Sequence, residues 1–427
     1  MLTRPFMPKS SFSKSVTQSV APSKAHKQPI ETVSSLKKVT FGLFIGSFIS
    51  FCNLYLFQPL LPLIAIHYQV SATHVNWVLA AATLTLALSL LPWAIYSEKI
   101  GRRKIMLLSL YASPVAGLAI LVSDQLPLLI ASRALMGIAL SGYISVAVAY
   151  MAEEFSPKVF LMAVGSYIGA NSLGGITGRI YGGIIGEWLG WQSAVLGMTL
   201  LSLLVAVWVT LWVPPQQHFQ AKDTRLSRHI KDAMQHLQTP HLWFAMLIGG
   251  LNFALFVNLY TVMGFRLVAA PFSLPVGLVS LIFLCYLTGT LTSKLSGQWS
   301  LRYPSTNGMI LGTIVSFIGM MVALIPHLYA MFTALILISG GAFFTHSLAY
   351  AWVSAKAQQA KASATALYLV HYYAGGSLGG FYLIYCWQHG GWNMVALGGT
   401  VLYIAMLGLV WQLKRVNKLS HETNQCT

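Results

Sequence analysis

Long apolar runs divide this chain into twelve hydrophobic segments, and the basic residues between them follow an alternating pattern. Every second connection carries lysine or arginine, whereas the connections between those are almost free of both. All but four of the 26 basic residues fall on one side if the chain crosses a membrane after each apolar run. Cytoplasmic loops of membrane proteins retain Lys and Arg, so this alternation predicts both the topology and its orientation. We expect both termini and the middle loop to lie in the cytoplasm.

The composition excludes a soluble globular protein for a chain of 427 residues, because 56% of the residues are hydrophobic and only 8% are charged. A net charge of +17 could suggest nucleic acid, but the basic residues sit in short loops beside apolar spans. We therefore expect contact with anionic lipid headgroups on the cytosolic face and no nucleic-acid partner. The 4 cysteines are isolated along the chain, so no disulfide framework, metal site or cofactor is expected.

The apolar segments have the length of membrane-spanning helices, for which about 20 residues suffice. They cover residues 40–65, 76–97, 105–123, 128–150, 160–184, 191–213, 242–265, 274–297, 306–325, 328–350, 363–386 and 392–413. Runs of this length cross a bilayer as helices, because a helix satisfies every backbone hydrogen-bonding group within its own segment. The predicted fold class is an all-α membrane protein with twelve transmembrane helices in two six-helix halves.

The longest internal connection separates the first six spans from the last six. It contains a polar stretch, Lys222 to Gln238, that is compatible with a short surface helix. The predicted organisation is a disordered basic cytosolic tail over 1–39, a six-helix bundle over 40–213, a cytosolic linker over 214–240, a second six-helix bundle over 241–413 and a cytosolic tail over 414–427.

The two halves resemble each other in sequence. The segment Tyr167-Ile-Gly-Ala-Asn-Ser-Leu-Gly-Gly-Ile176 in the fifth span matches Tyr372-Tyr-Ala-Gly-Gly-Ser-Leu-Gly-Gly-Phe381 in the eleventh. The sixth and twelfth spans both begin with Gly-Trp, at Trp191 and Trp392. Parallel repeats of six helices with a cavity between the halves are an architecture of transporters.

The loop after the second span carries the motif Ala94-Ile-Tyr-Ser-Glu98-Lys99-Ile-Gly101-Arg102-Arg103-Lys104. It resembles the loop signature of the major facilitator superfamily, Gly-x-x-x-Asp-Arg-x-Gly-Arg-Arg/Lys, with Ala94 for the first Gly and Glu98 for the Asp. The resemblance implies a gate formed by Glu98, Gly101, Arg102 and Arg103.

In the family, the acid of this motif caps a helix start in the other half and steadies the outward-facing state. Here that start would belong to the eleventh helix, near Lys361 to Ser363, whose N-terminal dipole attracts an acid. The alternative is that the loop carries only the ordinary charge of a cytoplasmic connection. The matching loop of the second half keeps Arg302 and lacks the acid.

The fourth span begins Arg133-Ala-Leu-Met136-Gly137, which is similar to the family's Arg-x-x-Gln-Gly motif with Met136 for Gln. A cation inside a transmembrane helix is a functional candidate by default. Alternatively, Arg133 could extend its side chain to the outer interface.

The fifth span is rich in glycine and resembles the Gly-x-x-x-Gly-Pro-x-x-Gly-Gly motif of family antiporters, with Ala170 for the Pro and an extra residue before Gly174. With Asn171, Arg179 and the Gln58-Pro-Leu-Leu-Pro62 run of the first span, it resembles the YnfM-type branch of drug and metabolite efflux proteins. The glycines expected to permit close helix packing are Gly165, Gly169, Gly174, Gly178, Gly182, Gly379 and Gly380.

None of the 9 acidic residues lies in the middle of a span, whereas many drug antiporters of this family carry an acid inside the first helix. The titratable groups left inside the spans are His346 and His371, and a histidine can change charge near neutral pH. Each could instead be a neutral packing residue. Arg179 and Lys294 lie near span ends and are expected to reach the interface. Side chains that could line a cavity are Asn53, Gln58, Tyr143, Tyr167, Asn171, Arg179, Asn252, Asn258, Tyr286, Tyr368 and Tyr372.

A membrane enzyme or an ATP-driven pump is disfavoured, because the chain has no HExxH motif, P-loop or clustered metal ligands. The leading hypothesis is a monomeric secondary transporter of the bacterial cytoplasmic membrane, exporting small amphipathic compounds in exchange for protons. The alternative is a proton-coupled transporter of a specific metabolite, such as an organic anion or a sugar. For coupling, His371 is the preferred titrating group and Arg133 its electrostatic partner in substrate binding or the state change.

Overall fold

The computed structural model describes residues 33–217, 219, 221, 231, 234–357 and 361–425. In these ranges the regular secondary structure is helical, which confirms the predicted fold class. The first half contains α1 (Val33–Tyr55), α2 (Leu61–His67), α3 (Ala72–Val75), α4 (Trp77–Ile100), α5 (Arg102–Leu121), α6 (Leu126–Glu154), α7 (Pro157–Leu189) and α8 (Trp191–Trp212). The second half contains α10 (Pro240–Val268), α11 (Val276–Val279), the 3-10 helix η1 (Ser280–Cys285), α12 (Tyr286–Ser300), α13 (Ser305–Val322), α14 (Leu328–Lys356) and α15 (Lys361–Gln425).

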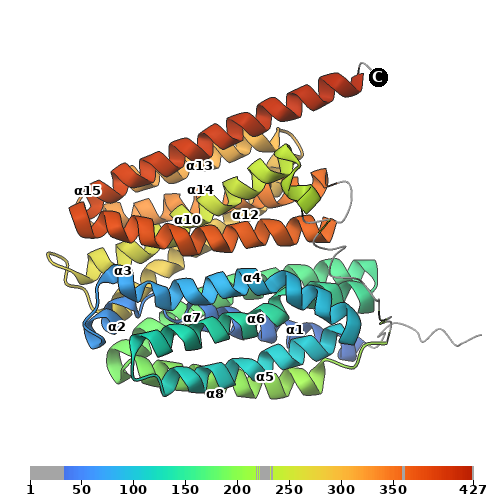
Figure 1. Ribbon diagram of the computed structural model, residues 1–427, viewed down its shortest axis with the longest axis horizontal. Helices are drawn as coiled ribbons and strands as arrows, with labels where there is room; N and C mark the ends of the chain where they lie inside the picture. The colour runs from blue at the N-terminus through green and yellow to red at the C-terminus, as the bar shows by residue number, and fades with distance from the viewer. Residues whose placement is uncertain are drawn as a thin grey trace, which may run out of the picture.

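The described residues contain 11 helical segments that are long and apolar enough to cross a membrane. The last of them, Ser363–Asn417, has 55 residues, more than twice the length that one crossing needs. Its backbone leaves the helical conformation at Gly390 and Gly391, where α15 folds back on itself into two arms (Figure 1). The predicted eleventh and twelfth spans lie on separate arms, and the total of twelve crossings stays a prediction.

The two halves of the chain form two side-by-side groups of helices (Figure 1). In the first group α1 packs on α7, α4 on α6, and α5 on both α6 and α8. In the second group α10 packs on α15, and α14 packs on α12 and α13. The groups meet where α4 contacts the first arm of α15 and where α7 contacts α11 and η1. Of the predicted disordered tail over 1–39, residues 1–32 lie outside the described residues, whereas residues 33–39 are helical and form the start of α1. Most of the predicted helix in the linker also lies outside the described residues.

The first predicted span, 40–65, is not one continuous helix. The α-helical hydrogen bonding ends with Leu56 N donating to Cys52 O, after which Gln58 N donates to Tyr55 O at 3.1 Å. The cause is Pro59, which has no N–H to donate and whose ring would clash with the carbonyl of Tyr55. The chain resumes as α2, so the first crossing carries a break beyond its middle, toward the short connection that follows α2.

The glycine stripe of α7 explains its close packing on α1. A methyl group at Gly178 would lie 2.5 Å from the backbone of Cys52, and Gly174 and Gly182 approach the backbones of Phe48 and Leu56 in the same way. On the first arm of α15, Gly379 meets Ala254 and Gly380 meets Asn76 and Asn258. The predicted packing role is wrong for Gly165 and Gly169, since a methyl group at either would meet no described atom within 4 Å.

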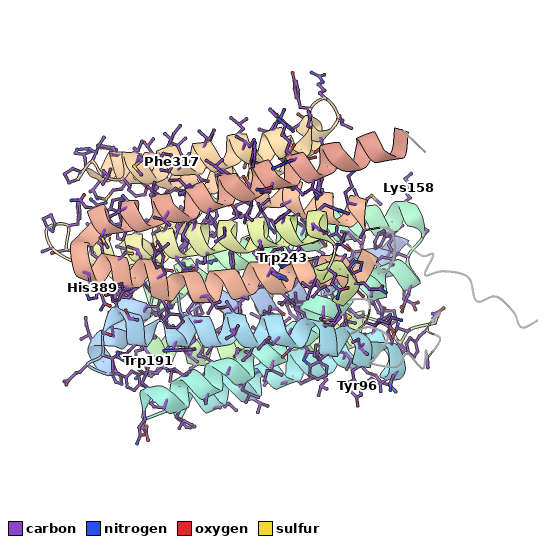
Figure 2. All side chains as sticks on the ribbon, turned by 45° about the horizontal axis from the view of Figure 1, so that its top comes forward. Tyr96, Lys158, Trp191, Trp243, Phe317 and His389 are labelled. Atoms are coloured by element: carbon purple, nitrogen blue, oxygen red, sulfur yellow. The ribbon has the colours of Figure 1, made fainter. Side chains whose placement is uncertain are left out.

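The opposite ends of the bundle differ in character. Tyr96 and Lys158 lie at the end that carries the basic loops, and Trp191 and His389 lie at the opposite end (Figure 2). We call these the basic end and the short-loop end. Between them large apolar side chains project from the outer surface, such as Leu204 (59% exposed) and Leu397 (61% exposed). An apolar belt of this kind suits a lipid environment, in which such side chains need no further cover.

Candidate functional site

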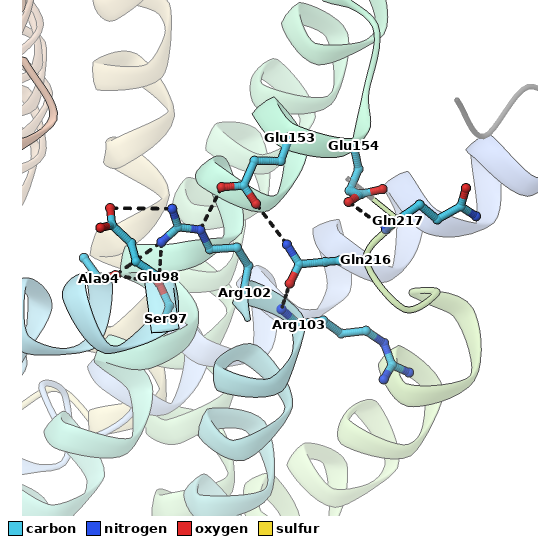
Figure 3. A network of polar contacts seen from close by, with 9 residues as sticks. All are labelled: Ala94, Ser97, Glu98, Arg102, Arg103, Glu153, Glu154, Gln216 and Gln217. Atoms are coloured by element: carbon cyan, nitrogen blue, oxygen red, sulfur yellow. Dashed lines mark hydrogen bonds and ion pairs between the residues drawn. The ribbon is translucent and has the colours of Figure 1, made fainter. Parts of the chain in front are cut away.

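The predicted gate motif forms a polar network at the basic end (Figure 3). The guanidinium of Arg102 donates from Nε to Glu153 Oε1 at 3.0 Å and lies 3.7 Å from Glu98 Oε1. It also donates from Nη1 to Ser97 Oγ at 2.5 Å and to Ala94 O at 3.2 Å. A single arginine thus joins the end of α4 to the end of α6.

The second arginine of the motif ties the start of α5 to the end of α8. Arg103 donates from Nε to Val213 O at 2.6 Å and from Nη2 to Thr210 O at 2.8 Å. Between α4 and α5, Gly101 has φ +107°, a value that L side chains rarely adopt. The chain therefore makes a tight turn at this glycine, which links α4 directly to α5.

The expected contact of Glu98 with the start of the eleventh helix stays a prediction. The structure places that start at Lys361, but the side chains of residues 361 and 362 and the preceding residues 358–360 lie outside the described residues.

At the short-loop end and in the middle of the bundle, hydrogen bonds join the two halves. Glu187, at the end of α7, accepts from the backbone N–H of Val276 at 2.5 Å and of Gly277 at 3.3 Å, at the start of α11. Thr83 and Ser377 share a hydrogen bond of 2.7 Å between α4 and α15. In the described part of the chain, the hydrogen bonds between the halves lie from the middle of the bundle to the short-loop end, so this end is closed.

Arg133 lies inside the first half and is fully buried. Its guanidinium donates to three backbone carbonyls, those of Val78 (3.0 Å), Asn53 (3.2 Å) and Leu54 (2.8 Å). The carbonyls of Asn53 and Leu54 are the ones that the break in the first span deprives of helical donors. The ring of Phe57 lies 4.3 Å from the guanidinium carbon. Arg133 therefore does not extend to the outer interface, and it acts as a structural tie for the broken helix.

Arg179 is also buried, with 2% of its surface exposed, so the expectation that it reaches the interface is wrong. It lies on α7 at the boundary between the halves, and Nε donates to Gln58 Oε1 at 2.6 Å. Gln58 in turn donates to Val257 O and Thr261 Oγ1, both at 2.9 Å, on α10 of the other half. The predicted cavity residues Gln58 and Arg179 thus form one bridge across the boundary. Lys294 is exposed, as expected.

The two predicted histidines occupy different surroundings. His346 lies between α14 and α15, where Nδ1 is 2.9 Å from the hydroxyl of Tyr368 and the ring centroid is 4.3 Å from that of Tyr372. His371 is hydrogen-bonded to Leu367 O one turn back, at 2.8 Å. It shares its helix face with Leu378, two turns further on, which is 63% exposed. His371 itself is half-buried, and its described ring contact stays within its own helix, whereas the ring of His346 on α14 contacts the neighbouring helix α15.

Several predicted cavity residues hold one half together instead. Asn53 donates to Ser202 Oγ at 2.7 Å, Tyr143 to Leu43 O at 2.8 Å, and Asn252 to Ala342 O at 3.0 Å. Tyr167 donates to Ile144 O at 3.3 Å, and Asn171 is hydrogen-bonded to Ser47. Each of these contacts joins helices of the same half, so these five side chains contribute to packing.

A small cavity of about 10 Å³ lies at the boundary, roughly the volume that one water requires. Its lining includes Tyr55, Asn76, Thr83, Phe253, Asn258 and Ser377. Of the predicted cavity residues, Asn258 lines it and Tyr372 stacks on Phe253 at 4.0 Å. Among the described residues no group of His, Cys, Asp or Glu could hold a metal ion.

Several contributors to the boundary were missed in the sequence, among them Tyr55, Thr261 and Glu187. Tyr55 and Thr261 lie in apolar runs, and no spacing rule identifies the partner of a single polar residue there. Glu187 carried a readable signal, because it is an isolated acid next to the short connection after the fifth span. The partner of Glu187 is the backbone N–H group at the start of a helix, and no side-chain pattern in the sequence identifies such a partner.

Comparisons with known proteins agree with this geometry. A family model described as Major Facilitator Superfamily matches residues 43–380. An MFS-type transporter of Bacillus subtilis, YybF, is 31% identical over 393 residues, covering 91% of this chain and 96% of its own. The inner membrane transport protein YnfM of Escherichia coli is 30% identical over 371 residues, covering 87% and 89%. Among solved structures, a bacterial homologue of the human lysosomal transporter Spinster, in an inward-facing and occupied conformation, superimposes with a TM-score of 0.72 at 14% identity, over 90% of this chain and 98% of the other.

Proposed function

The chain belongs to the Major Facilitator Superfamily of transporters, and on that premise we propose that it exports small amphipathic compounds in exchange for protons. Secondary transport follows from the family, and the chain is not an enzyme. The direction, the coupling ion and the substrate are the parts that we propose. Because the relative YnfM is an inner membrane protein, we also place this chain, as a monomer, in the bacterial cytoplasmic membrane with its basic end in the cytosol.

One observation carries the proposal of alternating access. The described hydrogen bonds between the halves, such as Glu187 to the α11 backbone and Gln58 to Thr261, lie from the middle of the bundle to the short-loop end. The bonds that Arg102 and Arg103 of the gate motif donate lie at the other end and join helices of the first half. Two such ends can alternate between closed and open states, and a substrate shifts the balance only by binding one state better.

For coupling, the geometry favours His346 over His371. His346 is hydrogen-bonded to a fully buried tyrosine, Tyr368, on the neighbouring helix, whereas the described hydrogen bond of the His371 ring stays within its own helix. A histidine changes charge near neutral pH, and here the gain of a proton would alter the contacts of α14 with α15. His346 is therefore the proton-binding group in our proposal.

A second candidate function is transport of a specific metabolite, such as an organic anion or a sugar. The observation that favours it is the buried cation of Arg179 at the boundary between the halves. A cation at this depth attracts an anionic group and repels the cationic compounds that many exporters carry.

The decisive experiment uses the purified protein in proteoliposomes. A thermal-shift screen over anionic, neutral and cationic amphipathic compounds first identifies a ligand. Flux of that ligand is then measured under an imposed pH gradient, with and without a protonophore. We expect transport that follows the gradient, stops with the protonophore and needs no ATP. Gradient-independent flux of every ligand found would contradict proton coupling.

A further inference from the structure

The guanidinium of Arg179 lies between the two halves, with its hydrogen bonds made to neutral acceptors. Nε donates to Gln58 Oε1 at 2.6 Å, and Nη1 donates to Gly175 O at 2.7 Å. Among the described residues no carboxylate forms an ion pair with it; the described ion pairs lie at the basic end, around Arg102. A positive charge that is 98% buried without an anionic partner is unfavourable unless something compensates it.

Three aromatic rings supply part of that compensation. The guanidinium carbon lies 3.8 Å from the ring centroid of Tyr55, and 4.9 Å from those of Phe283 and Tyr286. Tyr55 comes from the first half of the chain, whereas Phe283 and Tyr286 come from the second. Together with Gln58, these residues form what we call the Arg179 cluster, an aromatic cage around one cation.

A second observation points to a ligand. The hydroxyl of Tyr286 is buried and has no hydrogen-bond partner in the described part of the chain, although the residue is only 6% exposed. A buried hydroxyl without a partner costs about 1–3 kcal/mol, so native proteins rarely leave one. Its ring already faces the guanidinium, so an acceptor bound beside Arg179 lies close to this donor.

The helices that carry the cluster are irregular at this depth. The first crossing is broken next to Gln58. The eighth predicted span contains a 3-10 helix from Ser280 to Cys285, which includes Phe283 and directly precedes Tyr286. In transporters, discontinuous helices commonly form the substrate site near the middle of the membrane. A 3-10 segment inside a longer helix also often marks a hinge.

We propose that the Arg179 cluster binds the carboxylate of a small aromatic monoanion, which rests on the proposed export function and names the substrate class of its site. The planar guanidinium matches the two oxygens of a carboxylate. The tyrosine and phenylalanine rings suit an aromatic body. A second negative charge would have no second cation here, so a monoanion is favoured over a dianion.

The cluster also links binding to the conformational change. Gln58 holds Arg179 on one side and Val257 with Thr261 on the other, so separation of the halves breaks the Gln58 bridge and exposes the guanidinium. The carboxylate then takes the place of Gln58 Oε1 and accepts a hydrogen bond from the Tyr286 hydroxyl. The cavity of about 10 Å³ shares only Tyr55 with the cluster and is too small for an aromatic acid, so entry to the cluster requires this separation.

The test measures binding of three ring-matched probes to the full chain in nanodiscs, without a pH gradient. The probes are 2-naphthoate, 2-naphthamide and 2-naphthylmethylammonium. We expect the naphthoate to bind most tightly. Arg179→Gln should weaken naphthoate binding by roughly 10- to 100-fold and leave the amide unaffected, which is the range for loss of charge-assisted hydrogen bonds. Tyr286→Phe, which removes only the hydroxyl, should weaken it about 3- to 10-fold.

The matched control is Arg266→Gln. Arg266 is also a buried arginine, but it lies within the second half, donates to Ala323 O at 2.6 Å and stacks on Trp392. Its replacement should leave naphthoate binding unchanged. If Arg179→Gln does not fold, naphthoate binding to Tyr286→Phe and Arg179→Lys tests the proposal instead. Both variants keep the positive charge; the first loses the hydroxyl and the second loses the planar guanidinium.

Equal binding of the three probes to the wild type, or unchanged naphthoate affinity in the Arg179 and Tyr286 variants, would overturn the inference. A failure of the binding site can be distinguished from a failure of the proposed export function. Naphthoate binding without gradient-driven flux would refute proton-coupled export and leave the site intact. Gradient-driven export of neutral compounds without anion binding would refute the site alone.

Discussion

Replacement of Arg133 by methionine distinguishes a structural role from a role in substrate binding. Methionine keeps an unbranched apolar stem, is shorter than arginine and removes all donors. The wild-type guanidinium serves the carbonyls of Asn53 and Leu54, which the break at Pro59 leaves without helical partners. The change therefore leaves two buried carbonyls without donors, in a region that contains no bulk water.

The expected loss of stability follows from those groups. Each buried acceptor without a partner costs about 1–3 kcal/mol, so two amount to about 2–6 kcal/mol. Loss of the contact with the Phe57 ring, 4.3 Å from the guanidinium carbon, adds roughly 0.5–2 kcal/mol. Removal of a buried charge offsets part of this sum. We expect a net loss of about 2–5 kcal/mol and, with an unfolding entropy of about 0.9 kcal/mol/K for a chain of this length, a fall in melting temperature of about 2–6 °C.

The assay is thermal unfolding of the purified protein in detergent, followed by gel filtration, with Arg266→Met as the control. Arg266 is buried too, but its described hydrogen bond goes to a single carbonyl, that of Ala323. Arg266→Met should therefore lower the stability less than Arg133→Met does. Arg133→Lys keeps the charge but replaces the planar guanidinium by a point charge. Its melting temperature should lie between those of the wild type and Arg133→Met. If Arg133→Met unfolds like the wild type yet abolishes flux, the structural reasoning is refuted and an electrostatic role in transport stands.

Three further predictions concern gating and coupling. Glu187→Gln weakens the charge-assisted contact with the α11 backbone, so labelling of a cysteine placed at the short-loop end should become faster, and unchanged labelling would count against this contact as a gate. Gly101→Leu forces a side chain into the turn at φ +107° and should impair flux while the protein remains inserted; full activity would argue against the gate motif. His346→Gln should remove the pH dependence of flux while His371→Gln retains it, and the reverse result would return the coupling site to His371.

The sequence predicted the helices well because apolar length and charge alternation are both local signals. The proline break escaped the prediction although Pro59 was visible, since an apolar run continues on both sides of it. The turn in α15 was correctly placed at Gly391, where the Gly-Trp repeat marks a new span. The glycine stripe identified Gly174, Gly178 and Gly182 as packing residues, because a stride of four places them on one face.

The site was only partly predictable. The gate arginines were found because their motif lies in one short loop. For the intramembrane cations the residue type was visible in the sequence but the surroundings were not. Arg133 ties backbone carbonyls within the first half, whereas Arg179, one of the expected cavity residues, lies at the boundary. Arg133 serves carbonyls from two other helices, and Arg179 meets rings from both halves.

By itself, then, the amino-acid sequence determined that this protein spans a membrane as two similar helical halves, because hydrophobic length, charge and repeats are properties of contiguous segments. Only the tertiary structure decided which polar side chains face the boundary between the halves. In a span that is apolar all round, every helix face can be buried, so periodicity does not reveal which face meets lipid and which meets another helix. Which face meets another helix is decided by contacts between segments far apart in the chain, such as Gln58 with Thr261. These contacts place Arg179 at the boundary, where residues of both halves contact it.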